Sequence, residues 1–127
     1  MNIITFRKIK IVIYIMNIIN LCNIEFTKYN RNNLDVPGLL WHVISYEDDT
    51  GMGTYVLRYE PGAQTPTHTH MGYEEFMILK GSLFNSDGKV FEENMFVSFE
   101  PKTTHYTFSP DGCDVLVFSR GENKVNQ

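Results

Sequence analysis

Two histidines and one carboxylate lie close together near the middle of the chain. His68 and His70 are separated by one residue, and Glu74 follows four positions later. In a β-strand, residues two apart point to the same face, so both imidazoles are expected to project side by side. Glu74, a short turn later, can close on the same point. Imidazole and carboxylate ligands together bind divalent transition metals such as iron, manganese, nickel or zinc, so this segment predicts a metal site.

The spacing around these residues is specific. From Gly62 to Gly81 the chain follows the pattern G(x)5HxH(x)3E(x)6G, which is the first motif of the cupin superfamily, and all five fixed positions match. Two histidines on one strand are often only polar surface residues. Here they follow a turn at Pro61 and precede a run typical of a buried strand, which favours a binding site. The segment therefore resembles a cupin.

The same resemblance supplies a third histidine. The second cupin motif, G(x)5PxG(x)2H(x)3N, contributes a histidine from a neighbouring strand, and His105 falls where that histidine belongs. Other positions depart from the motif. Asn94 replaces the first glycine, which is a mild change because asparagine tolerates the left-handed backbone conformation. Lys102 replaces the second glycine, which is a true departure. The ligand set implied by the resemblance is His68, His70, Glu74 and His105.

From residue 39 onward, short apolar runs alternate with turn signals. The predicted strands cover residues 39–45, 54–59, 75–79, 82–84, 89–91, 95–99, 105–108 and 114–119. Strands of this length at even spacing, without a convincing amphipathic helix, indicate an antiparallel sandwich or barrel. The predicted fold class is all-β, as a small antiparallel jelly-roll β-barrel.

Within the cupins, the chain is most similar to the ChrR-type subgroup over about residues 51–120. The residues that carry this similarity are Leu57–Ala63, Pro66–Glu75, Leu79–Gly81, Ser109–Cys113 and Leu116–Val117. That subgroup includes zinc-bearing regulatory domains of anti-sigma factors and small stand-alone proteins. Similar cupins include dioxygenases that use Fe(II) to cleave carbon–carbon bonds of ketones.

Metal identity divides the functional hypotheses. Three histidines and one glutamate leave two open positions on an octahedral Fe(II), which suits a dioxygenase acting on a small organic substrate. The same four ligands satisfy tetrahedral zinc and favour a sensor or regulatory domain without catalysis. Manganese and nickel also suit these ligands. A metal-free barrel that binds a sugar or another small ligand is a third hypothesis, which the intact ligand set disfavours.

Two neighbouring residues leave alternatives open. Glu74 and Glu75 precede a run that is apolar on both faces, so strand alternation does not choose between them, and only the family spacing selects Glu74. Glu75 is then a solvated residue or one that orients a ligating imidazole. His42, outside both motifs, is expected to have a structural role.

Composition limits the remaining classes. The chain has 127 residues, enough for about one domain, and a net charge of −4. Its basic residues are scattered, so no nucleic-acid partner is expected. Two cysteines, Cys22 and Cys113, cannot form a dense disulfide framework. Cys113 is interpreted as a small, half-buried residue rather than a nucleophile.

The first thirty residues differ from the rest and are rich in isoleucine and asparagine. We assign residues 1–30 to an N-terminal extension and residues 31–127 to the barrel domain. The apolar run after Lys10 lacks a cleavage site and is too short to span a membrane, so a cytoplasmic protein is expected. The extension is either an added strand or dimer contact, or an upstream segment before a start at Met16. Since cupins commonly pair through N-terminal strands, the resemblance implies a homodimer.

Overall fold

The structure is a computed structural model that describes residues 2–6, 9–13 and 15–126. Apart from one 3-10 helix, η1 (Arg31–Asn33), its regular elements are strands. They are β1 (Asn2–Phe6), β2 (Ile9–Ile13), β3 (Thr27–Lys28), β4 (Leu39–Glu47), β5 (Met52–Tyr59), β6 (Ala63–Gln64), β7 (His68–His70), β8 (Glu74–Asn85), β9 (Val90–Glu92), β10 (Phe96–Phe99), β11 (Thr104–His105), β12 (Thr107–Ser109), β13 (Cys113–Arg120) and β14 (Asn123–Val125).

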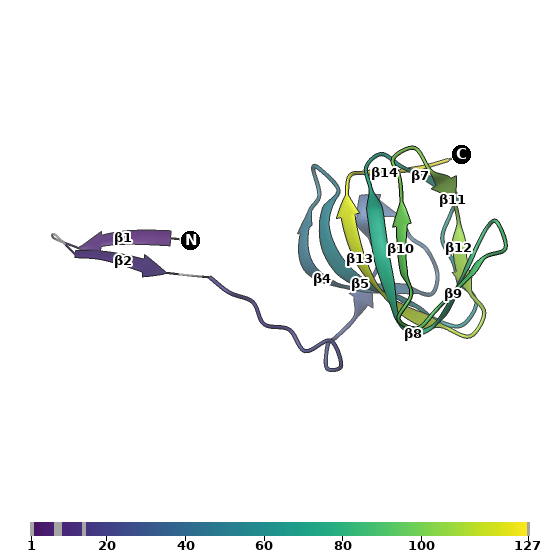
Figure 1. The fold of residues 1–127 in the computed structure, drawn as a ribbon, viewed down its shortest axis with the longest axis horizontal. Coiled ribbons are helices and arrows are strands. Elements are labelled where there is room, and N and C mark those ends of the chain that lie inside the picture. The colour runs from purple at the N-terminus through teal and green to yellow at the C-terminus, as the bar shows by residue number, and fades with distance from the viewer. Residues whose placement is uncertain (1, 7–8, 14, 127) are drawn as a thin grey trace.

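The strands from β3 onward curl into an antiparallel barrel (Figure 1). Its larger sheet has the order β3-β4-β5-β13-β8-β12-β6, and β9 and β10 also pair with β8. A smaller sheet, β11-β7-β14, carries His68 and His70 on its central strand. The predicted all-β jelly-roll fold is confirmed. No described helix is long and apolar enough to cross a membrane.

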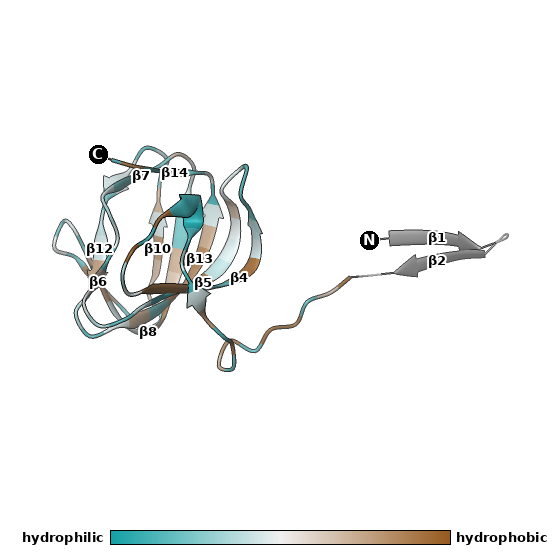
Figure 2. Cartoon of the chain, turned by 180° about the vertical axis from the view of Figure 1, so that it is seen from behind, coloured by the Kyte–Doolittle hydropathy of each residue, from teal (hydrophilic) through white to brown (hydrophobic). Residues whose placement is uncertain are grey.

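The interior of the barrel is apolar because alternate residues of its strands point inward. Along β13, Val115 and Val117 are buried while their neighbours are only partly so, and along β8 the same holds for Phe76 and Ile78. Figure 2 shows hydrophobic residues concentrated on the barrel strands, whereas many connecting loops are hydrophilic. Burying each such side chain contributes about 1.5–3 kcal/mol to folding. This core holds the short strands that carry the histidines.

β8 is one continuous strand. We predicted two strands, residues 75–79 and 82–84, with a turn between them at Lys80–Gly81, and that prediction is wrong. Gly81 has a φ of +78°, in the left-handed region that favours glycine. In the sheet this conformation bends the strand instead of ending it. Residues before Gly81 pair with β10 and β13, and residues after it pair with β9 and β12. The last glycine of the first motif thus lets β8 serve both halves of the barrel.

Replacing Gly81 with alanine is expected to destabilise the protein by about 2–5 kcal/mol. A left-handed alanine costs about 1–2 kcal/mol, and a forced contact typically adds about 1–3 kcal/mol. The new Cβ would collide with the carbonyl oxygen of Gly112. Gly88→Ala is the matched control, because Gly88 also has a positive φ, of +90°, but open space around it. Urea unfolding should show a clearly larger loss for Gly81→Ala; equal losses would contradict the collision.

The N-terminal part of the chain contains two separate features. β1 and β2 form a hairpin that Figure 1 draws apart from the barrel. Further on, Thr27 and Lys28 in β3 pair with Trp41 and Leu40 of β4, and Tyr29 is buried in the core. The short strand β3 therefore pairs with the barrel sheet close to the boundary we assigned at residue 30, whereas the role of the isoleucine-rich run before it stays a prediction. The division into extension and domain stays a prediction, and residues 1, 7, 8 and 14 lie outside the described residues.

Candidate metal centre

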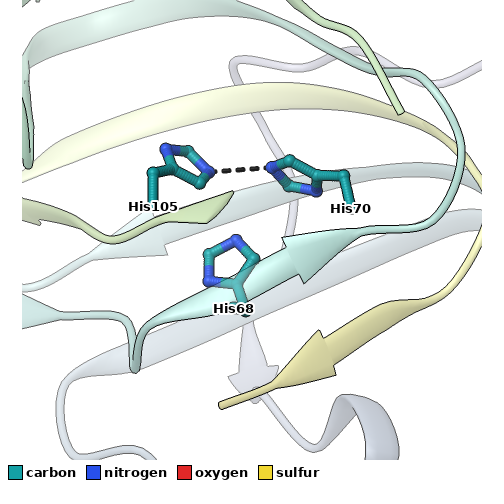
Figure 3. A group of neighbouring side chains, drawn as sticks. All are labelled: His68, His70 and His105. Carbon is teal, nitrogen blue, oxygen red and sulfur yellow. Dashed lines mark hydrogen bonds between the residues drawn. The ribbon is translucent and has the colours of Figure 1, made fainter. Parts of the chain in front are cut away.

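Two neighbouring strands bring the three predicted histidines together. β7 positions His68 and His70, and β11 pairs with it so that His105 lies directly opposite His68. All three side chains are buried, and one nitrogen of each lies within 4.8 Å of the others. The Nε2 atoms of His70 and His105 are 2.8 Å apart, as the dashed line in Figure 3 marks, and His68 faces both rings. The prediction that His68 and His70 share one face is confirmed.

The outer nitrogen of each ring, Nδ1, lies within hydrogen-bonding distance of an oxygen acceptor. His68 Nδ1 lies 2.7 Å from the carbonyl oxygen of Pro66, and His105 Nδ1 lies 2.7 Å from Asn85 Oδ1. His70 Nδ1 lies 2.8 Å from Asn123 Oδ1. Because these oxygens only accept hydrogen bonds, each Nδ1 must donate its proton. The neutral rings therefore keep their lone pairs on Nε2, which is the tautomer that binds a metal.

The protonation states of the three histidine rings suit metal binding. The contact of 2.8 Å between His70 Nε2 and His105 Nε2 is a hydrogen bond in which one ring donates a proton to the other. A metal ion bound by both nitrogens would take the place of that proton. Burial, followed by the charges of His68 and His70, lowers the pKa of His105 to about 3. Burial also lowers the pKa of His68. Two of the rings are therefore neutral near pH 7, as metal ligation requires.

Glu74 lies beside the centre rather than among the three converging nitrogens. Its Oε2 lies 3.0 Å from His70 Nδ1, the outer nitrogen, and its Oε1 lies 3.2 Å from Arg31 Nη1. Burial raises the pKa of Glu74, but the hydrogen bond and charge of His70 and the charge of Arg31 outweigh it and lower the pKa to about 2. Burial lowers the pKa of His70, and the contact with Glu74 outweighs this and raises it. Ligation by Glu74 stays a prediction.

Glu75 points to the outside of the barrel, where it forms an ion pair with Arg120. His42 lies on β4, and its Nδ1 is 2.8 Å from the carbonyl oxygen of Glu25. Cys22 is exposed, and neither cysteine forms a disulfide. Burial raises the pKa of Cys113 to about 12, so this thiol is not an activated nucleophile.

Sequence reasoning missed three polar residues that support the centre: Arg31, Asn85 and Asn123. Arg31 is only 1% exposed, although it stands in the asparagine-rich segment that leads into the barrel and resembles a surface loop in sequence. Asn85 begins the Asn-Ser-Asp-Gly turn, and Asn123 lies close to the C-terminus. Nothing local in the sequence marks these residues, because their partners lie between 20 and 90 positions away in the chain.

A small apolar cavity of about 50 Å³ adjoins the histidines. Its wall includes Leu57, Phe76 and Val115 from the core, and His68 and His105 reach it from the metal-binding side. A cavity that holds one water needs roughly 10–15 Å³. The space therefore suits a few waters or part of a small, largely apolar molecule.

Replacing Asn85 with leucine is expected to weaken metal binding by about 10–100-fold while the barrel stays folded, because residues that orient a ligating histidine have effects of this size. The change removes the acceptor that fixes the His105 ring. Asn94→Leu is a poor comparison, since Asn94 has a φ of +69°. Asn126→Leu, at an exposed asparagine near Thr69, is the better control. Titration with Zn²⁺ against a competing chelator would measure both, and equal affinities would contradict the role of Asn85.

Solved structures share this fold. A protein of Methylibium petroleiphilum PM1 proposed to be an acetylacetone dioxygenase has a TM-score of 0.75 and 13% identity, covering 91% of this chain and 84% of its own. An acetylacetone dioxygenase of Acinetobacter johnsonii has a TM-score of 0.73 and 15% identity, with 98% and 85% covered. At these identities the likeness shows the fold alone.

A third structure is that of Rhodobacter sphaeroides SigE in complex with the anti-sigma ChrR. It has a TM-score of 0.61 and 15% identity, and the alignment covers 79% of this chain and 50% of the other. No curated protein matches the sequence. The family described as the ChrR cupin-like domain matches residues 22–122. Because that match spans most of the chain, this protein belongs to the ChrR cupin-like domain family.

Proposed function

We propose that this protein binds one divalent transition-metal ion and uses it in a dioxygenase-type oxidation of a small organic substrate. The ligands common to the motif and the observed cluster are His68, His70 and His105. The observation that carries the proposal is the convergence of one nitrogen from each of the three rings to within 4.8 Å, with Nδ1 of each ring close to an oxygen acceptor. The motif adds Glu74 as a fourth ligand.

The protein residues have separate tasks in this proposal. The acceptors at Pro66, Asn85 and Asn123 orient the rings, and the apolar cavity wall excludes water and contacts the substrate. Tyr59 contributes a hydroxyl to that wall, 2.7 Å from Thr107 Oγ1. When bound, Fe(II) would supply open coordination positions for O2 and for an oxygen of the substrate. Small 1,3-diketones are the first substrates to test, because two structurally similar proteins are named for acetylacetone.

Metal analysis of anaerobically purified protein, followed by O2 uptake, tests this function. We expect about one iron per chain in the wild type and very little in His68→Ala. Acetylacetone and catechol should then be screened for metal-dependent O2 consumption. Absence of any transition metal from both proteins after exposure to Fe²⁺, Zn²⁺ and Mn²⁺ would reject the metal centre.

A zinc-binding sensor or regulatory domain is the second candidate. The family match and the fold shared with the anti-sigma ChrR favour it. Zinc prefers four ligands in structural sites, so this function is best served if Glu74 or a water completes the set. Tightly bound zinc, with no O2 uptake after iron loading, would select this candidate over the oxygenase.

We also propose that the protein is a cytoplasmic homodimer, with its N-terminal segment contributing to the contact. Ile15, Met16 and Ile18 in that segment are 72–88% exposed, an unusual position for large apolar side chains. Deleting residues 1–18, which removes these three side chains, should lower the dimer fraction in analytical ultracentrifugation and leave metal stoichiometry unchanged. Loss of metal together with the dimer would contradict the separation of these two roles.

A further inference from the structure

We propose that small apolar molecules enter the cavity beside the histidines by displacing residues 32–36, and that Leu34 in this segment limits the size of molecule that the cavity accepts. We call residues 32–36 the strap. Leu34 is a specificity-determining residue in this proposal. The proposal rests on the proposed function in one respect, that this cavity is the place where a small organic molecule binds.

The closed cavity is smaller than the molecules it would receive. Its volume is about 50 Å³, whereas an apolar cavity of about 150 Å³ is a size that holds benzene. Catechol, one of the compounds to be screened, contains a benzene ring and two further oxygen atoms. A molecule of this size therefore requires part of the cavity wall to move.

The strap is the part of the wall that is free of strand pairing. Leu57, Phe76 and Val115 line the cavity from β5, β8 and β13, and β13 pairs with both of the other strands over most of its length. Asn32 and Leu34 also line the cavity, but the strap forms no strand. Moving the strap breaks no ladder of backbone hydrogen bonds, so it costs less than moving the sheet.

The strap crosses the barrel between two fixed points. In Figure 2 the hydrophilic turn η1, which begins the strap, lies in front of the barrel strands. Directly before the strap, Arg31 is buried and donates to Tyr55 Oη and to the carbonyl oxygen of Gly121. At its other end, Val36 packs against the hydrophobic core. The residues between these points bridge the cavity.

Two exposed polar contacts fasten the strap to the barrel in the described part of the chain. Asn32 Nδ2 donates to the carbonyl oxygen of Asn123 in β14 at 3.1 Å. Asp35 forms an ion pair with Lys28 in β3 at 2.7 Å. Both side chains of that pair are mostly exposed, and exposed ion pairs add little stability. The hydrogen bond from Asn32 is therefore the main polar clasp.

The backbone at the start of the strap is strained. Asn32 and Asn33 have φ angles of +57° and +58°, in the left-handed region that glycine adopts freely and asparagine only tolerates. Strained backbone persists where surrounding contacts hold it, and it is concentrated at ligand clamps and switch regions. An open strap releases this strain, which favours opening when the clasp breaks.

Leu34 lies between the cavity and the solvent. Its side chain is half-buried and lines the cavity, as does that of Val125 in β14, the strand that the clasp reaches. One methylene group more or less in an apolar pocket changes the preference between two ligands by about 10–200-fold. The size of the side chain at position 34 is therefore expected to decide which molecules fit.

Xenon and benzene, two apolar probes without metal-binding atoms, test the size limit in NMR titrations of the metal-free protein. Xenon should bind the wild type, because a dry apolar cavity takes up this gas. Leu34→Ala should bind benzene at least about tenfold more tightly than the wild type, and Leu34→Val should change in the same direction. Leu40→Ala is the matched control, since Leu40 is also half-buried but lies on β4 outside the cavity lining.

The outcomes of these titrations are distinct. Equal benzene affinities in the wild type, Leu34→Ala and Leu40→Ala would overturn the role of Leu34. Absence of xenon binding from all of them would overturn the cavity as a binding site. Because neither probe binds a metal, the expected results in a protein that takes up no metal would reject the proposed function alone.

Xenon exchange between free and bound states tests entry beneath the strap. Asn32→Asp removes the donor to Asn123 but keeps a residue type that tolerates the left-handed region. Exchange should become about fivefold faster, the factor that corresponds to one hydrogen bond, with little change in affinity. Asn33→Asp is the control, because its φ is nearly the same and the clasp stays intact. Equal exchange rates in both variants would overturn this route of entry.

Discussion

Replacing His105 with alanine will lower metal affinity by about two to three orders of magnitude and leave less than a tenth of an ion per chain after dialysis. Structural zinc sites with four ligands bind their metal by roughly 10–16 kcal/mol, so one ligand accounts on average for about 2.5–4 kcal/mol. The Nε2 of His105 lies 2.8 Å from that of His70, and Asn85 holds its other nitrogen. Mass spectrometry of bound metal and chelator competition would measure the loss.

His42→Ala is the matched control for this variant. His42 lies on β4, away from the cluster, and its ring contacts the backbone at Glu25. It should keep the metal stoichiometry and affinity of the wild type. If both variants lost metal equally, general destabilisation would explain the result; if His105→Ala kept a full ion, the three-histidine centre would be wrong.

Replacing Arg31 with methionine is expected to destabilise the folded protein by about 3–5 kcal/mol, because breaking a buried ion pair leaves an uncompensated charge. The variant would leave Glu74 buried without its cationic partner. It would also remove the guanidinium group that donates hydrogen bonds to the carbonyl oxygens of Gly51 and Gly121. These two hydrogen bonds join the turn after β4 to the end of β13. Urea unfolding of the metal-free protein, at fixed pH, would measure the change.

The double variant Arg31→Met/Glu74→Met separates the ion pair from the other contacts of Arg31. Removing both charges avoids the lone buried carboxylate, so the double variant should be more stable than Arg31→Met alone. Arg58→Met is a suitable comparison, since Arg58 pairs with Asp114 in a half-exposed position and its loss should cost about 1 kcal/mol or less. Additive losses in the cycle would contradict coupling between Arg31 and Glu74.

The sequence was sufficient for the features that depend on local spacing. Alternation of apolar residues predicts the strands and the barrel, because the side-chain period of a strand is two. The same period places His68 and His70 on one face. The left-handed turn expected at Asn94 is present, with a φ of +69°. Lys102 takes the glycine conformation as well, with a φ of +71°, so the departure from the second motif changes the residue and leaves the backbone turn intact.

What the tertiary structure decided is the environment of each chemical group. Whether Gly81 ends a strand or bends it depends on the strands that pair with β8 on either side of it. Arg31 reads as a surface residue until strands β5, β8 and β13 enclose it and give it acceptors from distant parts of the chain. Local spacing determines which residues can meet, whereas burial and long-range hydrogen bonds determine which atoms they present. For this reason the sequence alone predicts the three histidines, and only the fold shows that Glu74 faces the outer nitrogen of His70.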